Sequence, residues 1–472
     1  MINILTMSLD TDVRSAAQEI LSCDAATVIS HIDADGISSE SILSQAVSRA
    51  GIPVSTIFLR QLDPLTIHEI PDDDSLKIFS DFGSGQQSLL MEQGLQPDEV
   101  IIIDHHVSQP ADAGFVEVNC LSHGYEKMSA AGVAYLVARS MDDVNRDLAK
   151  LAVIGNIGDM MDRETLRLTG PAREIVSDGI GYGNVEIWEH DLNIYGISTR
   201  PLPNSLAYSD DMEIPGVSQD PEGARRFLER IGIRPVSGNR WPVWEDLGFA
   251  EKQTVVSAII DQMMAHGKSA DRLFADHYLF PDENRARAAL RNASEYATLL
   301  NSCGRWKRPE LGGQICRGDR VAAFREAEQM LRNHRNKIRE VMEYITDTGV
   351  SELSHMLYLH VGDRFPDTIV GIGAGMSLSR LNPAKPILIM CEDSLDPSKT
   401  KISMRTRPEV VEKGIDLQKA LCLACERFDG SSGGGHRIAA GAFIPREAEQ
   451  EFIEDVNRIL GQQYAQTSPG PC

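Results

Sequence analysis

Four short stretches carry His and Asp side chains whose types and spacing suit metal binding. They are "HIDADG", "SDFGSG", "DHH" and "GNIGD", and their ionisable residues are His31, Asp33, Asp35, Asp81, Asp104, His105, His106 and Asp159. A single Asp at a strand end is commonly a helix cap, and a single His is commonly structural. Four such ends in one chain favour a shared metal site instead.

Clustered carboxylates raise one another's pKa unless cations lie between them. Imidazole and carboxylate without thiolate suit Mn²⁺ or a similar first-row ion, whereas Mg²⁺ prefers more oxygen ligands and water. Asp81 holds the central position, so we expect it to bridge two metal ions. Two ions about 3.5–4 Å apart can activate water and neutralise phosphate oxygens, so the pattern predicts phosphoryl chemistry.

The elements that carry these residues alternate between strand-like and helix-like patterns. The strand-like runs are "AATVIS", "SLKIFS" and "EVIIID", and "SSESILSQAVSRAG" has a helical period with a Gly stop. This alternation predicts an α/β fold with a mostly parallel sheet and helices on its faces. Parallel strands would bring the four stretches to one rim of the sheet, where active sites gather.

The 472 residues divide into four expected parts. We expect a metal domain over residues 1–200, a mainly helical insertion over 201–310, a connecting long helix over 311–348 and a substrate-binding domain over 349–465. In the last part "SHMLYLHV", "KPILIMCED" and "TKISMRT" alternate with at least one helix, which predicts a smaller mixed α/β domain. No apolar run could span a bilayer and no leader pattern is visible, so we expect a cytoplasmic protein without a membrane partner.

The charge of the chain is unevenly distributed. The formal net charge of −23 argues against non-specific nucleic-acid binding by the whole surface. Residues 285–339 nevertheless hold 13 Lys and Arg against 5 Asp and Glu. This basic stretch is either a solvated helix face or a track for a polyanion.

A second group of candidate residues lies near the C-terminal end of the sequence. The stretch "GSSGGGH" predicts a glycine-rich loop, in which Gly433, Gly434 and Gly435 let backbone N–H groups approach an anion. His436 can donate a hydrogen bond to phosphate, and Arg405 can make a bidentate contact. A flexible turn is the usual alternative for a run of glycines, but the strand-like stretch after it would fix the loop.

These motifs resemble those of the DHH phosphoesterase superfamily. The four acidic motifs cover roughly residues 25–160, and "GGGH" with "AAGAFIP" resembles the DHH-associated domain over roughly residues 350–460. The whole chain resembles archaeal RecJ-like single-strand exonucleases, the group that includes the GINS-associated nuclease. The stretches "LRNASEYATLLNSCGR" and "YGISTRPL" also resemble that group.

The resemblance implies a role for each residue of the motifs. His31 and Asp33 would hold one metal ion, and Asp35, His105 and Asp159 the other, with Asp81 between them. Asp104 and His106 would be catalytic: Asp104 would orient a histidine, and His106 would contact the scissile phosphate or assist as an acid. Arg405, Gly433, Gly434, Gly435 and His436 would bind the substrate.

The resemblance also implies an activity, with alternatives. It implies metal-dependent hydrolysis of single-stranded nucleic acid, 5′ to 3′ on DNA, releasing mononucleotides through a water activated by two metal ions, in replication or repair. Two Mn²⁺ ions are expected, with Mg²⁺ as the alternative cofactor. Other members act as manganese pyrophosphatases, on short RNA or on cyclic dinucleotides, so RNA, short oligonucleotides and small phosphoesters remain alternative substrates. A replisome scaffold that binds a GINS-like protein is the alternative from another class.

Overall fold

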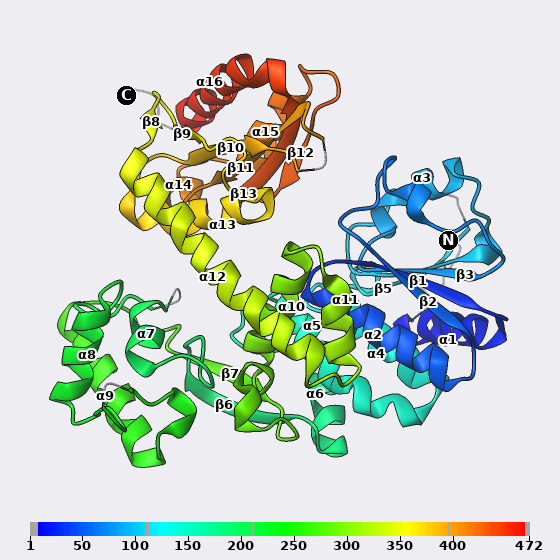
Figure 1. The fold of residues 1–472 in the computed structure, drawn as a ribbon, viewed down its shortest axis with the longest axis horizontal. Coiled ribbons are helices and arrows are strands. Elements are labelled where there is room, and N and C mark those ends of the chain that lie inside the picture. The colour runs from blue at the N-terminus through cyan, green and yellow to red at the C-terminus, as the bar shows by residue number, and fades with distance from the viewer. Residues whose placement is uncertain (1–7, 110–113, 210–211, 239, 395, 468–472) are drawn as a thin grey trace, which may run out of the picture. The chain divides into compact units, whose positions relative to one another are not determined.

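The computed structural model describes residues 8–109, 114–209, 212–238, 240–394 and 396–467. These residues form two compact units, which divide between Glu328 and Gln329. Figure 1 traces the order of their helices and strands. Among the described residues, no helix combines the length and the apolar composition that crossing a membrane requires.

Unit 1 is organised around a five-stranded parallel sheet with the strand order β2-β1-β3-β4-β5. Its strands are β1 (Ala26–His31), β2 (Val54–Leu59), β3 (Leu76–Ser80), β4 (Val100–Asp104) and β5 (Val116–Asn119). The helices around it are α1 (Leu9–Ser22), α2 (Ala34–Arg49), α3 (Gln87–Glu92), α4 (Ala130–Met141), α5 (Ala149–Gly158) and α6 (Gly170–Tyr182). The predicted α/β fold with a parallel sheet is confirmed.

The central strands are continuous apolar runs because both faces of the sheet are covered. Ile29, Phe79 and Ile102 point to one face, where they join a cluster with Leu90 of α3. Alternate side chains point to the other face, where α2, α4 and α5 pack against one another. Burial on both sides therefore fixes the rim at which the strands end.

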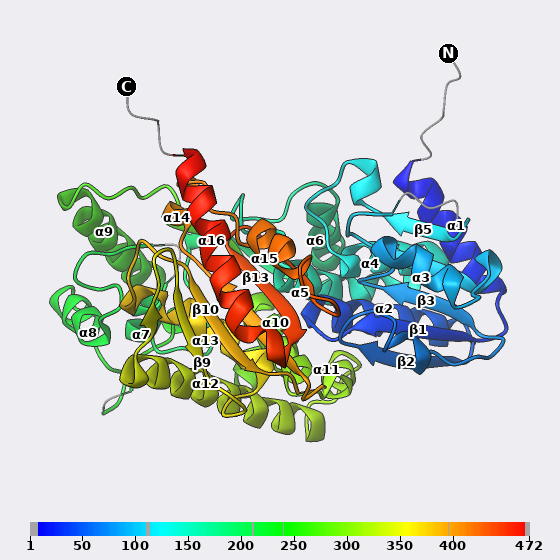
Figure 2. The same ribbon diagram turned by 90° about the horizontal axis from the view of Figure 1, so that it is seen from above.

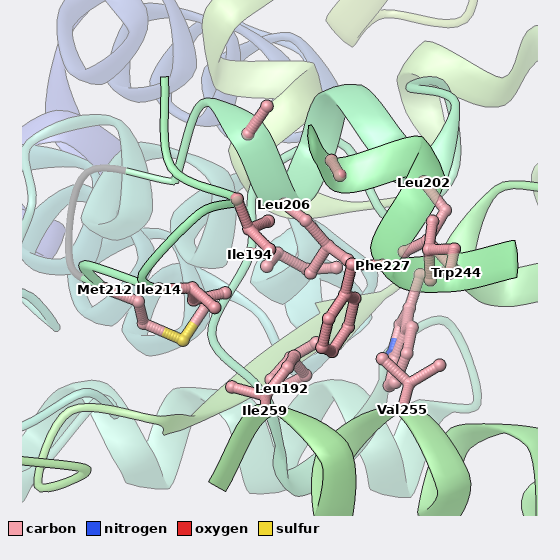
Figure 3. Close-up of a cluster of buried hydrophobic side chains, with 14 of the residues drawn as sticks. Leu192, Ile194, Leu202, Leu206, Met212, Ile214, Phe227, Trp244, Val255 and Ile259 are labelled. Atoms are coloured by element: carbon pink, nitrogen blue, oxygen red, sulfur yellow. The ribbon is translucent and has the colours of Figure 1, made fainter. Parts of the chain in front are cut away.

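An insertion with its own core follows α6. It contains β6 (Glu186–Leu192), α7 (Leu202–Ala207), α8 (Pro221–Arg230), α9 (Phe249–Ala265) and β7 (Phe274–Leu279). Figure 3 shows its core, in which Phe227 and Trp244 are buried among aliphatic side chains. The antiparallel pairing of β6 with β7 was not predicted from the sequence. The charged stretch "EIWEHDL" of β6 lacks the apolar pattern of a buried strand, because most of that strand is not buried.

The chain after β7 returns to the helices of the parallel sheet. Its helices are α10 (Ala293–Arg305), α11 (Pro309–Cys316) and α12 (Ala322–Thr348), and α10 packs on α5 and α2. The connecting long helix expected over residues 311–348 begins at Ala322, because the separate helix α11 occupies the start of that range. Short segments of 3-10 helix complete the described part of the chain, at Ile67–Glu69, Ser84–Gln86, Pro97–Glu99, Leu121–His123, Asp143–Leu148, Trp244–Asp246, Arg285–Leu290, Leu378–Arg380 and Arg446–Ala448.

Ion pairs explain much of the basic stretch that the sequence analysis noted. Each Arg named here pairs with a carboxylate: Arg285 with Asp246, Arg287 with Glu283, Arg291 with Glu245, Arg308 with Glu310, Arg317 with Glu40 and Arg320 with Glu283. The pairs made by Arg285, Arg291, Arg317 and Arg320 join separate parts of unit 1. These guanidinium groups do not form an unpaired track for a polyanion.

Unit 2 is a mixed sheet covered on both faces by helices. Its strand order is β12-β13-β11-β10-β9-β8, and β9 and β10 are the parallel pair. Its strands are β8 (Ser351–Glu352), β9 (Leu357–His360), β10 (Ile387–Glu392), β11 (Lys399–Arg405), β12 (Ser432–Gly435) and β13 (Ala439–Pro445). Its helices are α13 (Asp367–Ser377), α14 (Pro408–Glu412), α15 (Leu417–Cys425) and α16 (Glu449–Thr467). Helices α15 and α16 share one core with the sheet, and Figure 2 shows α13 behind it. The predicted mixed α/β domain is confirmed.

A buried carboxyl group on α10 gives the fold a testable pH dependence. Burial raises the pKa of Glu295 from 4.5 to about 7, although hydrogen bonds from residues 198–199 oppose the rise. The folded protein therefore binds more protons than the unfolded chain between pH 4.5 and 7, and its stability falls as the pH rises through that window. The free energy of unfolding of Glu295→Gln, minus that of the parent, should therefore be larger at pH 8 than at pH 5, by on the order of 2 kcal/mol. Urea unfolding of both proteins at both pH values measures this difference, and equal differences would contradict it.

Candidate metal centre

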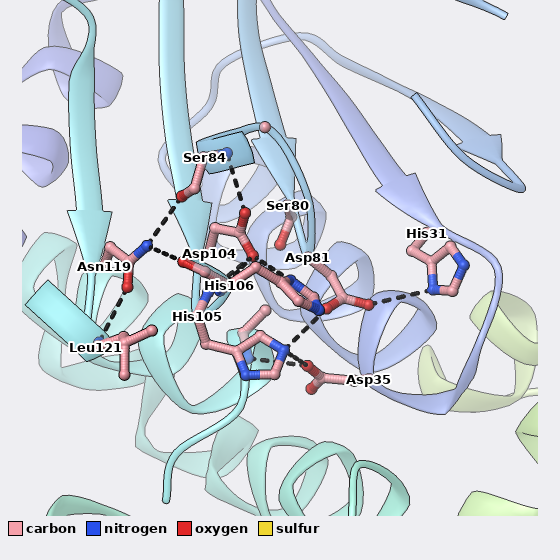
Figure 4. Close-up of polar contacts among 12 residues, drawn as sticks. His31, Asp35, Ser80, Asp81, Ser84, Asp104, His105, His106, Asn119 and Leu121 are labelled. Carbon is pink, nitrogen blue, oxygen red and sulfur yellow. Dashed lines mark hydrogen bonds and ion pairs between the residues drawn. The ribbon is translucent and has the colours of Figure 1, made fainter. Parts of the chain in front are cut away.

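The carboxyl ends of three neighbouring strands bring the predicted ligands together (Figure 4). His31 ends β1, Asp81 follows β3, and His105 follows β4. The ligand atoms of His31, Asp33 and Asp81 lie within 4.8 Å of one another. The same spacing holds for the ligand atoms of a second group, Asp35, His105 and Asp159.

Asp81 lies between the two groups. Its Oδ2 is 3.4 Å from Nδ1 of His31, and its Oδ1 is 3.3 Å from Nε2 of His105. The backbone of Asp81 is in the left-handed region, with φ at 64°, which a non-glycine residue seldom adopts. Its N–H donates to the carbonyl of Ile103 at 3.1 Å. An unfavourable backbone conformation at a cluster of this kind indicates a functional constraint on the position of the carboxylate.

The N-terminus of α4 holds Asp35. Its two carboxylate oxygens accept the N–H groups of Ala130 at 2.8 Å and Ala131 at 3.0 Å. Asn156 supports this turn, because its Oδ1 accepts the N–H of Ser129 at 3.0 Å. A Cβ on Gly155 would lie 2.6 Å from Oδ1 of Asp35. The "GN" of the fourth motif therefore makes room for Asp35 and fixes the helix end that binds it.

Asp104 orients His106. The Asp104 carboxylate is buried and accepts the N–H of Ser84 at 3.0 Å and Nδ1 of His106 at 2.8 Å. Burial alone would raise the pKa of Asp104, but the hydrogen bond and the charge of His106 lower it to about 2. The Nδ1 contact leaves Nε2 of His106 on the far side of a ring whose side chain is 58% exposed. This nitrogen is the one available to a bound molecule.

The donor set fits divalent cations. Nε2 of His105 is buried and satisfies hydrogen-bond geometry with no group in the described part of the chain. It faces the carboxylates of Asp81 at 3.3 Å, Asp159 at 3.4 Å and Asp35 at 3.9 Å. Burial, and then the charge of Asp81, raise the pKa of the Asp35 carboxyl. A cation among these groups would bind the nitrogen and offset the repulsion of the carboxylates.

Metal removal should therefore lower stability. A divalent ion that binds the folded protein and not the unfolded chain adds about 2.7 kcal/mol at 100 times its dissociation constant. We expect the melting temperature to rise when Mn²⁺ replaces EDTA. Differential scanning calorimetry at constant ionic strength measures the rise, with Ca²⁺ and NaCl as controls for charge screening. An equal melting temperature in EDTA and Mn²⁺ would contradict metal binding at this rim.

The predicted substrate residues lie in unit 2. Arg405 ends β11, and its Nη1 donates to the carbonyl of Met404 at 2.8 Å. The predicted glycine-rich loop is wrong, because Gly433 to Gly435 belong to strand β12 and pair with β13. Gly434 faces Gly441 across the pair, so two backbones without side chains make a regular ladder there. His436 begins the turn after this strand and is exposed.

Sequence reasoning missed several residues that support the site. Glu117 on β5 accepts hydrogen bonds from Ser84 at 2.6 Å and Ser108 at 2.9 Å. Asn119 donates to the carbonyl of His106 at 2.8 Å. On α10, burial lowers the pKa of Arg305, and the charge of Asp33 opposes that shift. These residues sit in no motif of the acidic type, and tertiary contacts alone reveal them.

Family models match three parts of the chain. Residues 25–156 match the DHH family N-terminal domain, residues 194–275 the DHH-CID domain and residues 354–462 the DHHA1 domain. The chain therefore belongs to the DHH superfamily and combines these three domains. The predicted superfamily is confirmed.

Two curated relatives differ in how much of the chain they cover. An uncharacterized protein of Methanocaldococcus jannaschii is 28% identical over 448 residues, which are 92% of this chain and 93% of that protein. A prophage-derived protein of Bacillus subtilis, YorK, is 32% identical over 146 residues, which are 28% of this chain and 25% of that protein. YorK carries the provisional name of a single-strand DNA-specific exonuclease.

Two solved structures share the fold. RecJ from Thermus thermophilus, solved in complex with Mn²⁺, superposes with a TM-score of 0.58 at 17% identity and covers 96% of this chain. The chain spans 56% of that RecJ. CDC45 from Entamoeba histolytica superposes with a TM-score of 0.63 at 12% identity, over 96% of this chain and 98% of that one. The fold is therefore RecJ-like.

Proposed function

We propose that this DHH phosphoesterase is a two-metal single-strand exonuclease that degrades DNA from the 5′ end to mononucleotides. The observation that carries the proposal is the position of Asp81, whose two oxygens face two separate groups of metal-type ligands. A pair of ions held this way suits the displacement of a phosphate ester by water. Mn²⁺ is the proposed ion because the ligands combine imidazole with carboxylate. Mg²⁺ is the alternative, and RecJ from Thermus thermophilus was solved with each of these ions.

The ligand groups define what each side chain does. His31 and Asp33 would hold one ion, Asp35, His105 and Asp159 would hold the other, and Asp81 would contact both. When bound, the ions would neutralise phosphate oxygens and make water a better nucleophile. Asp104 holds His106 so that its Nε2 can contact the scissile phosphate or protonate the leaving oxygen.

Three observations support a nucleic-acid strand as the substrate. YorK, which matches 28% of this chain, is named for single-strand DNA. In unit 2, Arg405 ends a strand of the sheet that carries the Gly433–Gly435 strand and His436, groups that suit a phosphate. The chain also carries a DHH-CID insertion with its own core, whereas the resemblance implies that small-molecule members of the superfamily usually have no long insertion.

A product ladder tests the proposal. Single-stranded DNA and RNA, each labelled at either end, would be incubated with the protein and Mn²⁺. Immediate release of labelled mononucleotide from 5′-labelled DNA is the expected result. Release from RNA alone, or from oligomers of a few nucleotides alone, would move the function to RNA turnover. No cleavage of any polymer would leave pyrophosphate, cyclic dinucleotides or a scaffold role as the functions to test.

A partner protein extends the proposal. The resemblance to the group of the GINS-associated nuclease, together with the fold shared with CDC45, supports a place in a replication complex with a GINS-like protein as partner. The ligand set is complete, so the proposed docking accompanies catalysis and does not replace it. Separate elution of the two proteins in gel filtration at micromolar concentration would count against this partner.

A further inference from the structure

The segment that carries the ligands Asp33 and Asp35 is held by a residue much later in the chain. Oδ1 of Asn301, on α10, accepts the backbone N–H of Ala34 at 2.9 Å, although the two residues are 267 positions apart. Ala34 lies between Asp33 and Asp35, which belong to the two different ligand groups. One side-chain amide therefore fixes the peptide that joins a ligand of one group to a ligand of the other.

The same helix approaches this segment one turn later. A Cβ on Gly304 would lie 1.8 Å from the carbonyl oxygen of Ile32, closer than any side chain could be placed. The backbone of α10 is thus in direct contact with the segment between His31 and Asp33. Asn301 and Gly304 are three residues apart, so they lie on the same face of the helix.

We propose that Asn301 and Gly304 are positioning residues of the metal centre. They fix the backbone from Ile32 to Ala34, and through it the carboxylates of Asp33 and Asp35. The inference rests on the proposed metal centre and is independent of the substrate. It makes α10, which follows the insertion in the chain, part of the catalytic machinery, although α10 offers no ligand to the ions.

The other end of α10 touches the insertion itself. Oε2 of Glu295 accepts the N–H of Ser198 at 3.2 Å, and Ser198 lies within the DHH-CID match. The contacts with Ser198 and with Ala34 therefore lie on one rigid helix, Ala293–Arg305. A displacement of α10 by the insertion would reach Asp33 and Asp35 through Asn301 and Gly304.

Metal affinity of the whole chain tests the role of Asn301. Isothermal titration with Mn²⁺ should show Asn301→Ala binding about 10- to 100-fold more weakly than the parent, as expected when a group that orients metal ligands is lost. Asn301→Asp keeps an acceptor for the Ala34 N–H and should bind Mn²⁺ more tightly than Asn301→Ala. Asn333→Ala is the matched control, because exposed Asn333 on α12 contacts Gln329 of its own helix. Circular dichroism and urea unfolding in EDTA check that each variant folds.

Gly304→Ala supplies an independent variant. Its methyl group would collide with the Ile32 carbonyl, so Mn²⁺ affinity should fall by a similar factor. Gly181→Ala, in α6, is its control, since a Cβ there meets no atom within 4 Å. Equal Mn²⁺ affinity of the parent, Asn301→Ala and Gly304→Ala would overturn the positioning role and leave the metal centre standing. A parent that binds no Mn²⁺ would overturn both.

Discussion

Asp81→Asn should abolish hydrolysis, with turnover reduced by about 10³-fold or more. The substitution removes the charge that faces both His31 and His105 and leaves the shape of the side chain unchanged. Asn also tolerates the left-handed backbone that Asp81 adopts, so the fold should persist. Turnover of labelled single-stranded DNA measures the loss of hydrolysis, and Mn²⁺ titration measures the loss of the bridging ligand.

The choice of Asn matters for the interpretation. Alanine at a φ of 64° would add a backbone penalty of about 1–2 kcal/mol, which would confuse loss of a ligand with loss of stability. The unfolding midpoint of Asp81→Asn in EDTA should match that of the parent or exceed it, because one charge among several carboxylates is gone. Undiminished Mn²⁺ binding by Asp81→Asn would exclude Asp81 as a bridging ligand.

Arg405→Ala should raise KM by about 10- to 100-fold and change kcat less, because a charged hydrogen bond to phosphate contributes about 1.5–3 kcal/mol to binding. Burial lowers the pKa of Arg405. Its Nη1 donates to main-chain carbonyl oxygens. Because a guanidinium has five N–H donors, others are left for an anion. Steady-state kinetics on a short 5′-phosphorylated oligonucleotide measure the effect.

A matched arginine separates recognition from general charge. Arg446 is also in unit 2, is 54% exposed and pairs with Glu392 at 2.8 Å. Arg446→Ala removes the same charge and should leave KM near the parent value. If both variants raise KM equally, Arg405 acts through the overall field of the domain and not through contact with the substrate.

The sequence predicts the strands and ligands of the first sheet well, for a physical reason. Strands β1, β3 and β4 are buried on both faces, so their apolar runs are long and their polar residues begin where burial ends. Asp81 and His105 are therefore recognisable in the sequence as polar residues just beyond apolar runs. Parallel pairing then places them at one rim without further information.

Other features depend on contacts that no local pattern records. The role of Asn301 requires Ala34, which is 267 positions away. The Gly433–Gly435 stretch has the composition of a loop, yet pairing with β13 makes it a strand. Arginines such as Arg320 resemble a basic track in the sequence, because their carboxylate partners lie elsewhere in the chain.

The long separation between Ala34 and Asn301 has a consequence for biosynthesis. At about 5–20 residues per second, a ribosome needs roughly 10–50 s to pass from one to the other. In the later part of that interval, after Asp159 has been made, all the proposed metal ligands exist while the helix that carries Asn301 does not. An ion bound during that interval would meet Asp33 and Asp35 before Asn301 and Gly304 contact the backbone between Ile32 and Ala34.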